Sequence, residues 1–258
     1  MIRPKKVILV SRATIKDLVS GQIFLIAFFI GLALAVLSYI GVELSYGAPK
    51  KVALDFGMGL ISLANIVICL FLGVRVLQAE VENRTLYMIL SRPVSRTEFY
   101  LGKFFGLAFC VLAINLILAL QTLFTFFIYG GSFDPLIPWA VIFTYLEGIL
   151  ILAFVILFSI ITTNIAATLY GISILIFGHA VPNLLDLNFV KNNPGLHWFV
   201  EKIGYIIPDL VKINIKDHLL YGKEISQIYL FSGLAYILIF ITLVCFVTSV
   251  VFKRKDLN

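Results

Sequence analysis

One carboxylate lies well inside a long apolar run: Glu147, in the stretch from Pro138 to Ile161. At 1.5 Å per residue it lies about 14 Å along a helix that begins at Pro138, near the mid-depth of a bilayer. An acidic group at that depth is costly unless it is paired or hydrated, so it usually faces a bundle interior or a cavity. Two interpretations stay open. Glu147 faces a polar path or pairs across a helix bundle, or it is a protonated carboxyl that hydrogen-bonds to a neighbouring helix.

The next apolar run carries His179 and Asn183 near its outer end, on either side of Pro182. Proline lacks a backbone donor, so we expect Pro182 to kink or end the helix. The freed backbone groups would be satisfied by His179 or Asn183. Metal binding is the competing interpretation, but His197 and His218 are distant in sequence. Together with Glu147, these two residues are the candidate polar residues of a transport path.

Signatures of catalysis and nucleotide binding do not occur in the sequence. Gly102-Lys103 is followed by Phe104 rather than Ser or Thr, and no glycine precedes it by five residues, so a phosphate loop is excluded. His-Glu-x-x-His does not occur, and no protease-like grouping of Ser, His and carboxylates is evident. The three cysteines lie in apolar runs without metal-ligand or redox spacing: Cys69, Cys110 and Cys245. We therefore expect no catalytic, cofactor-binding or metal site, and no enzyme activity, in this chain.

The composition indicates a protein that uses lipid as its solvent. Of 258 residues, 61% are hydrophobic and 13% are charged, against roughly 45–50% and 25% in soluble domains. A soluble fold of this size could not cover that much apolar surface. The net charge of +6 is distributed around the apolar runs, so it does not indicate a nucleic-acid partner.

Six apolar runs are long enough to cross a membrane as helices. None alternates polar and apolar residues as the strands of a membrane barrel do. The sequence therefore predicts an all-α polytopic membrane protein with six transmembrane helices in a single domain, 1–258. The fourth and fifth spans are separated only by residues 162–164, which predicts a tight hairpin. The expected spans are Gln22–Gly41, Phe56–Val74, a third from after Lys103 to about Ile128, Pro138–Ile161, Ile165–Leu185 and Tyr229–Phe252.

The distribution of Lys and Arg predicts the orientation. With six spans both termini share a side, and that side carries thirteen of these residues, including all seven arginines, against seven on the other. Cytoplasmic loops carry the excess of Lys and Arg. We expect both termini in the cytoplasm of a bacterial cell and the chain in the inner membrane.

The most informative stretch is the cytoplasmic segment 75–103. Its first part, Val76–Leu90, contains neither Gly nor Pro and is compatible with a helix, which Pro93 would stop. Ser95 and Glu98 then form a capping box that starts a helix continuing into the third span. A short stiff helix joined to two spans could transmit the movement of a bound partner to both spans. The alternative is an ordinary basic loop.

This segment resembles a known family. Its pattern is similar to the signature after the second span of ABC-2 type permeases, and more closely to the subgroup that serves copper-enzyme maturation, including the nitrous-oxide-reductase maturation permease. The segment before the last span and the C-terminal tail resemble the same permeases. The residues that carry the resemblance are Glu80, Glu82, Thr85, Leu86, Leu90, Ser91, Pro93, Val94, Ser95, Arg96, Gly102 and Lys103, then Ile207–Leu210, Asn214–Asp217, Tyr221, Gly222 and Phe252–Leu257.

The resemblance implies an ABC-2 exporter-type (type V) fold and a permease subunit of an ATP-driven transporter, with export as the favoured direction. It implies a second permease copy, two copies of a separate ABC ATPase that holds ATP and Mg, and room for an accessory periplasmic protein. Segment 75–103 would couple the two subunits. The candidate coupling residues are Glu80, Glu82, Arg84, Thr85, Leu86, Arg92 and Pro93.

Two further segments lie outside the spans. The N-terminal segment 1–20 is expected to form an interfacial helix that touches the ATPase or anchors at headgroups. Its apolar arc is predicted to comprise Val7, Ile8, Ile15, Leu18 and Val19. Segment 186–224 has apolar residues at helical spacing near Trp198 and Tyr205, which suits an external or re-entrant element that caps a path or shields a dimer.

Two other functions compete with transport driven by ATP. An intramembrane enzyme would need Glu147 and His179 to converge, which their position on consecutive spans permits. An ion-coupled carrier would need more buried ionisable residues than this chain has. The substrate does not follow from the sequence.

Overall fold

The structure is a computed structural model that describes residues 3–20, 23–43, 49–82, 95–221 and 225–254. These residues are almost entirely helical and contain no strand. The helices are α1 (Pro4–Ser20), α2 (Ile23–Glu43), α3 (Pro49–Glu82), α5 (Arg96–Ile128), α6 (Leu136–Ile161), α7 (Asn164–Asp186), α8 (Asn188–Lys191), α9 (Pro194–Ile206), the 3₁₀ turn η1 (Val211–Ile213), α10 (Lys216–Tyr221) and α11 (Gln227–Arg254).

Five of these helices are long and apolar enough to cross a membrane: α3, α5, α6, α7 and α11. This confirms the all-α polytopic membrane fold. Helix α2 is not among the five, although it has 21 residues and no charge before Glu43. The count of six spans therefore stays a prediction.

Helix α6 is the central helix of the bundle. Two thirds of its most apolar window is buried, against 22% for α7 and for α11. It packs against α3, α5, α7 and α11, so most of its surface contacts protein. Its sequence is accordingly apolar on all faces of the helix. Most residues of α6 are thus shielded from lipid, among them Glu147, which is 6% exposed.

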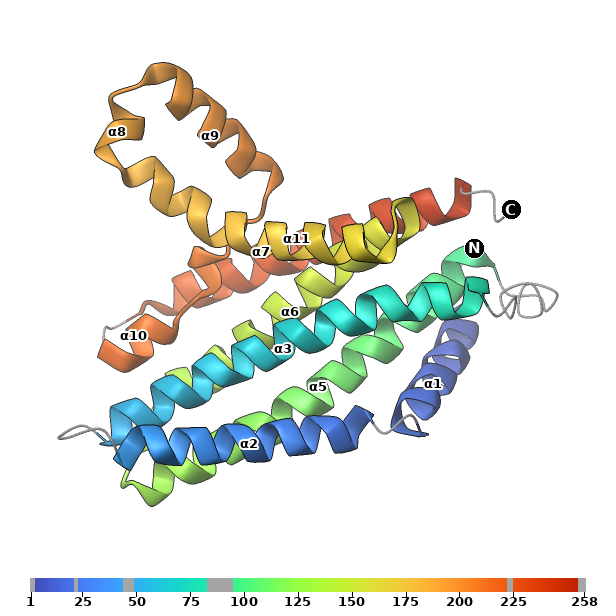
Figure 1. The fold of residues 1–258 in the computed structure, drawn as a ribbon. Helices are drawn as coiled ribbons and strands as arrows, with labels where there is room; N and C mark the ends of the chain where they lie inside the picture. Colours follow the sequence, from blue (N-terminus) through green and yellow to red (C-terminus); the bar gives the residue numbers. More distant parts are fainter. Residues whose placement is uncertain (1–2, 21–22, 44–48, 83–94, 222–224, 255–258) are drawn as a thin grey trace.

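The ends of four helices meet at one end of the molecule. Figure 1 shows the start of α1, the end of α3, the start of α5 and the end of α11 on the same side. The Phe99 ring of α5 stacks on the Phe252 ring of α11, with centroids 6.5 Å apart. The start of α1 and the end of α11 therefore lie on the same side of the bundle as the ends that flank residues 83–94.

Local sequence signals set several boundaries as expected. Ser95 caps α5, and its side chain and that of Glu98 make both hydrogen bonds of the capping box. Helix α6 ends at Ile161 and α7 begins at Asn164, which confirms the tight hairpin. Pro182 does not end α7, because it lies inside a helix that continues to Asp186. The part of the predicted Val76–Leu90 helix that the structure describes is the continuation of α3.

The N-terminal helix packs on the bundle through a small buried side chain, since Thr14 is only 2% exposed. The physical reason is that α1 packs closely on glycines of α5, and small side chains fit such a contact better than large apolar ones. Val10 and Leu18 pack against the core, and Leu18 belongs to the predicted apolar arc. Ile8 and Val19 of that arc are each 53% exposed, and contact of the arc with the membrane interface stays a prediction.

Residues 187–221 divide into two parts. Helices α8 and α9 protrude from the bundle (Figure 1), and Trp198 and Tyr205 on α9 are 60% and 70% exposed. The chain then returns, and Leu210, Ile213 and Ile215 are buried in the main core. We call residues 207–221 the docked segment. The buried part thus lies C-terminal to the helix from Leu196 to Ile207 that the sequence indicated.

Candidate functional site

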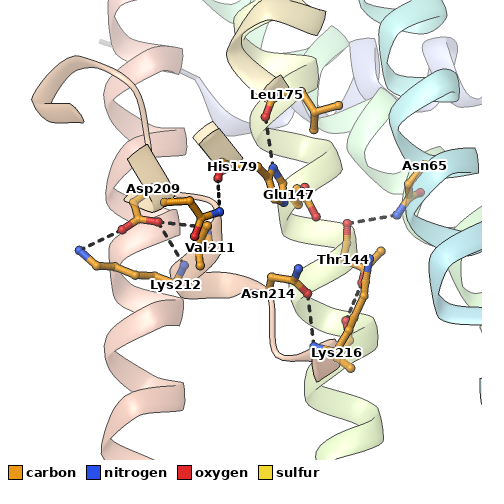
Figure 2. A network of polar contacts seen from close by, with 12 residues as sticks. Asn65, Thr144, Glu147, Leu175, His179, Asp209, Val211, Lys212, Asn214 and Lys216 are labelled. Atoms are coloured by element: carbon orange, nitrogen blue, oxygen red, sulfur yellow. Dashed lines mark hydrogen bonds and ion pairs between the residues drawn. The ribbon is translucent and has the colours of Figure 1, made fainter. Parts of the chain in front are cut away.

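The polar cluster centres on Glu147 and His179, which lie on the neighbouring helices α6 and α7. Oε1 of Glu147 lies 3.6 Å from Nε2 of His179, as Figure 2 shows. Glu147 is only 6% exposed, while the His179 side chain is 37% exposed. The structure therefore brings together two of the three residues that the sequence singled out, and the pair joins the central helix to a peripheral one.

The other ring nitrogen of His179 faces its own helix. Nδ1 lies 3.2 Å from the carbonyl oxygen of Leu175. Asn183, the third candidate, is exposed, and its Nδ2 donates to the carbonyl of His179 at 2.9 Å. The carbonyl that Pro182 leaves free is that of Gly178, four residues before it, and its hydrogen bond comes from the N–H of Leu210. The prediction that His179 or Asn183 satisfies the freed group is therefore wrong.

A lysine that the sequence did not single out completes the cluster. Lys216 lies at the start of α10, which contacts α6. In Figure 2 its side chain runs alongside Thr144, one turn from Glu147 on α6. A buried carboxylate with two basic neighbours can hold a proton or pair with a cation.

An amide on α3 borders the same face of α6. Asn65 is fully buried, and its Nδ2 donates to the carbonyl of Thr144 at 3.3 Å. Its Oδ1 has no hydrogen-bond partner within the described part of the chain. A buried amide oxygen without a partner is uncommon, so this position has a free acceptor beside the Glu147 turn.

The docked segment is held at a carbonyl that Pro182 leaves free. Proline cannot donate to the residue four positions before it, and that residue is Gly178. The N–H of Leu210 donates to the Gly178 carbonyl at 3.1 Å. A Cβ on Gly178 would lie 2.7 Å from Cγ of Leu210 and 2.9 Å from the carbonyl oxygen of Pro208. The proline and the glycine together create the docking position.

Polar contacts around Asp209 fix the docked segment to α11. The N–H of Asp209 donates to the hydroxyl of Tyr236 at 2.8 Å. The Asp209 carboxylate accepts from the N–H of Val211 at 3.0 Å and pairs with Lys212 at 3.4 Å. The segment is thus anchored to α7 and α11 and carries Lys216 toward α6.

A second candidate region lies at the end where both termini meet, and we call it the capped junction. Glu98 is 3% exposed. Its Oε2 accepts from the N–H of Ser95 at 2.9 Å, and its Oε1 accepts from the N–H of Arg3 at 2.7 Å. One carboxylate thus satisfies backbone donors at the start of α5 and at the start of α1.

Two glycines one turn apart let α1 approach α5 closely. A Cβ on Gly102 would lie 2.5 Å from Cβ of Val10, and one on Gly106 would lie 2.8 Å from Cβ of Thr14. Spacing of small residues by four is the pattern that allows helix backbones to approach within a membrane. Helix α1 is therefore packed against α5 as well as hydrogen-bonded to it.

The predicted coupling residues are only partly within the described structure. Glu80 and Glu82 belong to the last turn of α3, whose backbone alone is described there. The other five lie outside the described residues: Arg84, Thr85, Leu86, Arg92 and Pro93. Helix α3 continues eight residues past Val74, the end of its membrane-compatible part. At 1.5 Å per residue this is an extension of about 12 Å.

Sequence patterns missed three parts of these sites. Lys216 lies sixty-nine residues from Glu147, so no local pattern connects them. Glu98 was recognised as a capping residue, but its bond to Arg3 depends on how α1 packs. Gly178 did carry a signal, since a glycine four residues before an intrahelical proline marks a free carbonyl with open space beside it.

The family is decided by a match that extends over nearly the whole sequence. The model of a family described as ABC-2 family transporter protein matches residues 12–257. The chain belongs to the ABC-2 family of transporter proteins. It is accordingly a transmembrane permease of the ABC transporter class, and the family implies pairing with an ABC ATPase subunit. No curated protein matches this ABC-2 permease. Its described residues contain no group of three or more His, Cys, Asp or Glu that could hold a metal ion.

Proposed function

We propose that this chain is the permease subunit of an ATP-driven exporter and that segment 75–103 couples it to a separate ATPase. Two copies of the chain would form the membrane-spanning unit, with two ATPase subunits on the side where both termini lie. Both termini would then be cytoplasmic, and the membrane would be the bacterial inner membrane. ATP and Mg would be bound by the partner.

The observation that carries this proposal is the stiffness of the elements that flank residues 83–94. Helix α3 runs unbroken from Pro49 to Glu82, so a force on its charged end would be transmitted along a single rod of about 50 Å. On the other side α5 begins at once with the complete capping box of Ser95. A partner bound at this segment would therefore move two membrane helices together.

The polar cluster supports a role inside the bundle. Glu147 and His179 lie on α6 and α7, and the docked segment covers them from the end opposite the termini. We propose that these residues, with Asn183, contribute polar surface to the translocation path, and that the docked segment closes its outer end. Substitution of Glu147 by Gln is then expected to impair transport while the complex still assembles.

The narrower resemblance to permeases of copper-enzyme maturation bears on the cargo. The residues that carry it, Ile207–Leu210 and Asn214–Asp217, largely form the docked segment, whose backbone is bound at Gly178 and Tyr236. On that basis we propose an exported cargo that serves a periplasmic metalloenzyme, received by an accessory periplasmic protein.

An intramembrane enzyme is the second candidate, because it required Glu147 and His179 to converge. They do lie 3.6 Å apart, and an acid–histidine pair can carry out proton transfer. Membership of the ABC-2 family favours transport. In a transporter the acid–histidine pair would not have to react with a substrate.

Co-purification tests the proposal directly. The tagged chain, isolated in mild detergent from the membranes of its own cells, should bring down an ATP-hydrolysing protein in about equal amount. The double variant Glu80→Lys/Glu82→Lys reverses two charges of the docking end and should reduce the captured ATPase at least about tenfold.

The matched control is Asp186→Lys/Glu201→Lys, which reverses two charges at the opposite end of the bundle. This control should retain the ATPase at the level of the unchanged protein. Absence of an ATPase from the unchanged protein, or equal capture by the Glu80/Glu82 variant, would overturn the assignment of the coupling segment.

A further inference from the structure

We propose that a buried water site lies where α3, α5 and α6 meet, and that it holds at least one water molecule between the side-chain amides of Asn65 and Asn115. The ligand is water, bound by groups that together can donate and accept hydrogen bonds. The site does not depend on the proposed function, because it concerns the folded permease without partner or cargo.

The polar atoms of the site come from two fully buried amides. Asn65 on α3 and Asn115 on α5 are each 0% exposed. Oδ1 of Asn65, and both Oδ1 and Nδ2 of Asn115, have no hydrogen-bond partner within the described part of the chain. Buried side-chain amides are nearly always hydrogen-bonded, either to protein or to ordered water. Because lipid tails cannot supply such a bond, the three atoms indicate a bound ligand.

Asn65 lies on the part of α3 that turns from α5 toward α6. Its Nδ2 donates to the carbonyl oxygen of Thr144 on α6 at 3.3 Å (Figure 2), and a Cβ on Gly148 of α6 would lie 3.6 Å from its Cγ. Eight residues earlier, a Cβ on Gly57 would lie 2.9 Å from Oγ1 of Thr122 on α5. Eight residues rotate a helix by about 80°, so Asn65 lies beside α6 and close to the face that contacts α5.

Asn115 lies on a face of α5 that borders the same two helices. It is seven residues from Ala108 and seven from Thr122, and seven residues are close to two helical turns, so the three share one face. The carbonyl of Ala108 accepts from the hydroxyl of Tyr145 on α6 at 3.1 Å, and Thr122 lies against Gly57 of α3. The face of Asn115 therefore contacts α6 at one end and α3 at the other.

The two amides lie at nearly the same depth in the bundle. Helices α3 and α5 run in opposite directions (Figure 1). From the contact between Gly57 and Thr122, Asn65 lies about 12 Å along α3 and Asn115 about 10.5 Å back along α5, at 1.5 Å per residue. The difference of about 1.5 Å is much less than one helical turn, so both amides belong to one layer of the junction.

The mixture of donors and acceptors selects water over a cation. The bond from Nδ2 to the Thr144 carbonyl fixes the orientation of the Asn65 amide, so its free atom is an acceptor oxygen. Asn115 adds one oxygen and one NH₂ group. A cation would be repelled by the NH₂ hydrogens, whereas water can accept from them and donate to the oxygens. A buried water molecule typically makes about three such bonds.

The site joins the two helices that flank residues 83–94. Asn65 lies inside the membrane-compatible part of α3, and Asn115 lies inside that of α5. A water-mediated hydrogen bond is nearly as favourable as a direct one. If segment 75–103 couples to an ATPase as proposed, the water site ties together, inside the membrane, the two helices that the partner moves.

The first experiment observes water at the Asn115 amide. The full chain, with ¹⁵N-labelled asparagine and isoleucine, is placed in lipid bilayers, and solid-state NMR measures magnetisation transfer from water. The side-chain signals are identified by their loss in Asn65→Ser and Asn115→Ser. Nδ2 of Asn115 should receive magnetisation at short mixing times at which the amide of Ile151, 0% exposed in an apolar cluster, receives none. Absence of transfer at both positions would overturn the water site.

The second experiment tests whether the two amides share one site. In lipid nanodiscs, Asn65→Leu and Asn115→Leu should each lower the midpoint of thermal unfolding by about 5 °C, because each leaves the other amide without its bridging water. The double variant should lower it by clearly less than the sum of the two shifts, because it removes both amides and leaves neither unpaired.

Gln121→Leu provides the comparison for this cycle. Gln121 lies on the same helix as Asn115, and its Oε1 also has no partner in the described part of the chain. It lies against α2 instead, since a Cβ on Gly31 would lie 3.1 Å from its Cδ. The shifts of Asn65→Leu and Gln121→Leu should therefore add. Additive shifts for Asn65→Leu and Asn115→Leu as well would contradict a shared site.

A third measurement separates water from a cation. The midpoint of thermal unfolding should be the same in buffers of equal ionic strength that contain Na⁺, K⁺ or choline. A midpoint that depends on the cation in the unchanged protein, but not in Asn65→Leu, would assign the site to a cation and reject water as the ligand.

None of these measurements uses an ATPase or a transport assay. Their failure would leave the coupling proposal intact, and failure of the co-purification test would leave the water site intact.

Discussion

The capped junction and the polar cluster each contain one buried carboxylate that holds two parts of the chain together, but the partners differ in kind. Glu98 accepts from two backbone N–H groups, those of Ser95 and Arg3. Glu147 faces an imidazole at 3.6 Å. Backbone donors cannot lose their protons at any ordinary pH, whereas an imidazole can.

This difference indicates a division between a fixed end and an adjustable interior. At the junction, α1 and the start of α5 are tied by donors that are always present and by close packing at Gly102 and Gly106. In the cluster, α6, α7 and the docked segment are tied by side chains whose charge can change. A permease that must move as a unit at one end and rearrange in its interior has use for both kinds of contact.

The largest effect is expected from filling the space between α1 and α5. Gly102→Leu places a large side chain where a Cβ alone would lie 2.5 Å from Val10. We expect α1 to be displaced, and the free energy of unfolding to fall by about 3 kcal/mol, the upper end for overpacked sites. Thermal unfolding and tryptic cleavage within α1, in nanodiscs, measure this.

Gly59→Leu is the matched control for that substitution. Gly59 also lies inside a long helix, α3, but no atom lies within 4 Å of the position that a Cβ would take. Leucine there should stabilise the helix by up to about 1 kcal/mol, because it has a higher helix propensity than glycine. Equal tryptic sensitivity of α1 in the two variants would show that the close contact with α5 does not hold α1.

The second effect in size concerns the carboxylate of the junction. Glu98→Ala removes the acceptor of two backbone N–H groups at once, and buried donors without partners are destabilising. We expect a lower midpoint of thermal unfolding by several degrees, with tryptic cleavage of α1 before the rest of the chain. Ser95→Ala, which removes only the N-cap acceptor, should lower the midpoint less. An unchanged midpoint in Glu98→Ala would show that this carboxylate does not hold the junction.

Much of the fold could be predicted because its signals are local. The capping box of Ser95 and Glu98 lies within four consecutive residues, and the hairpin between Ile161 and Asn164 is set by two long apolar runs with three residues between them. The predicted spans agree closely with α5, α6, α7 and α11. Helix α3 begins earlier than predicted, at Pro49, because Lys50, Lys51 and Asp55 are tolerated in its first turns.

The contacts between distant segments could not be predicted in the same way. The packing of Thr14 against α5 was not predicted, because apolar periodicity favours large residues while the glycines of α5 select small ones. The pairing of Glu147 with His179 was permitted by their consecutive helices, but the relative rotation of α6 and α7 decides it. The return of the chain at Leu210 depends on Pro182 and Gly178, which act as a docking position only once the chain has folded.

The smallest effect on stability is expected in the cluster, from Glu147→Gln. A glutamine amide can both donate and accept a hydrogen bond, so the contact with the His179 ring, and with it the contact between α6 and α7, survives with either tautomer of the ring. We expect the free energy of unfolding to change by less than about 1 kcal/mol. Glu98→Gln should cost more, because its amide nitrogen would face a backbone N–H, donor against donor. Thermal unfolding of the two variants side by side in one lipid decides the comparison. If Glu147→Gln were as costly as Glu98→Gln, the interior carboxylate would be as fixed as the one at the junction, and the division between the two regions would be wrong.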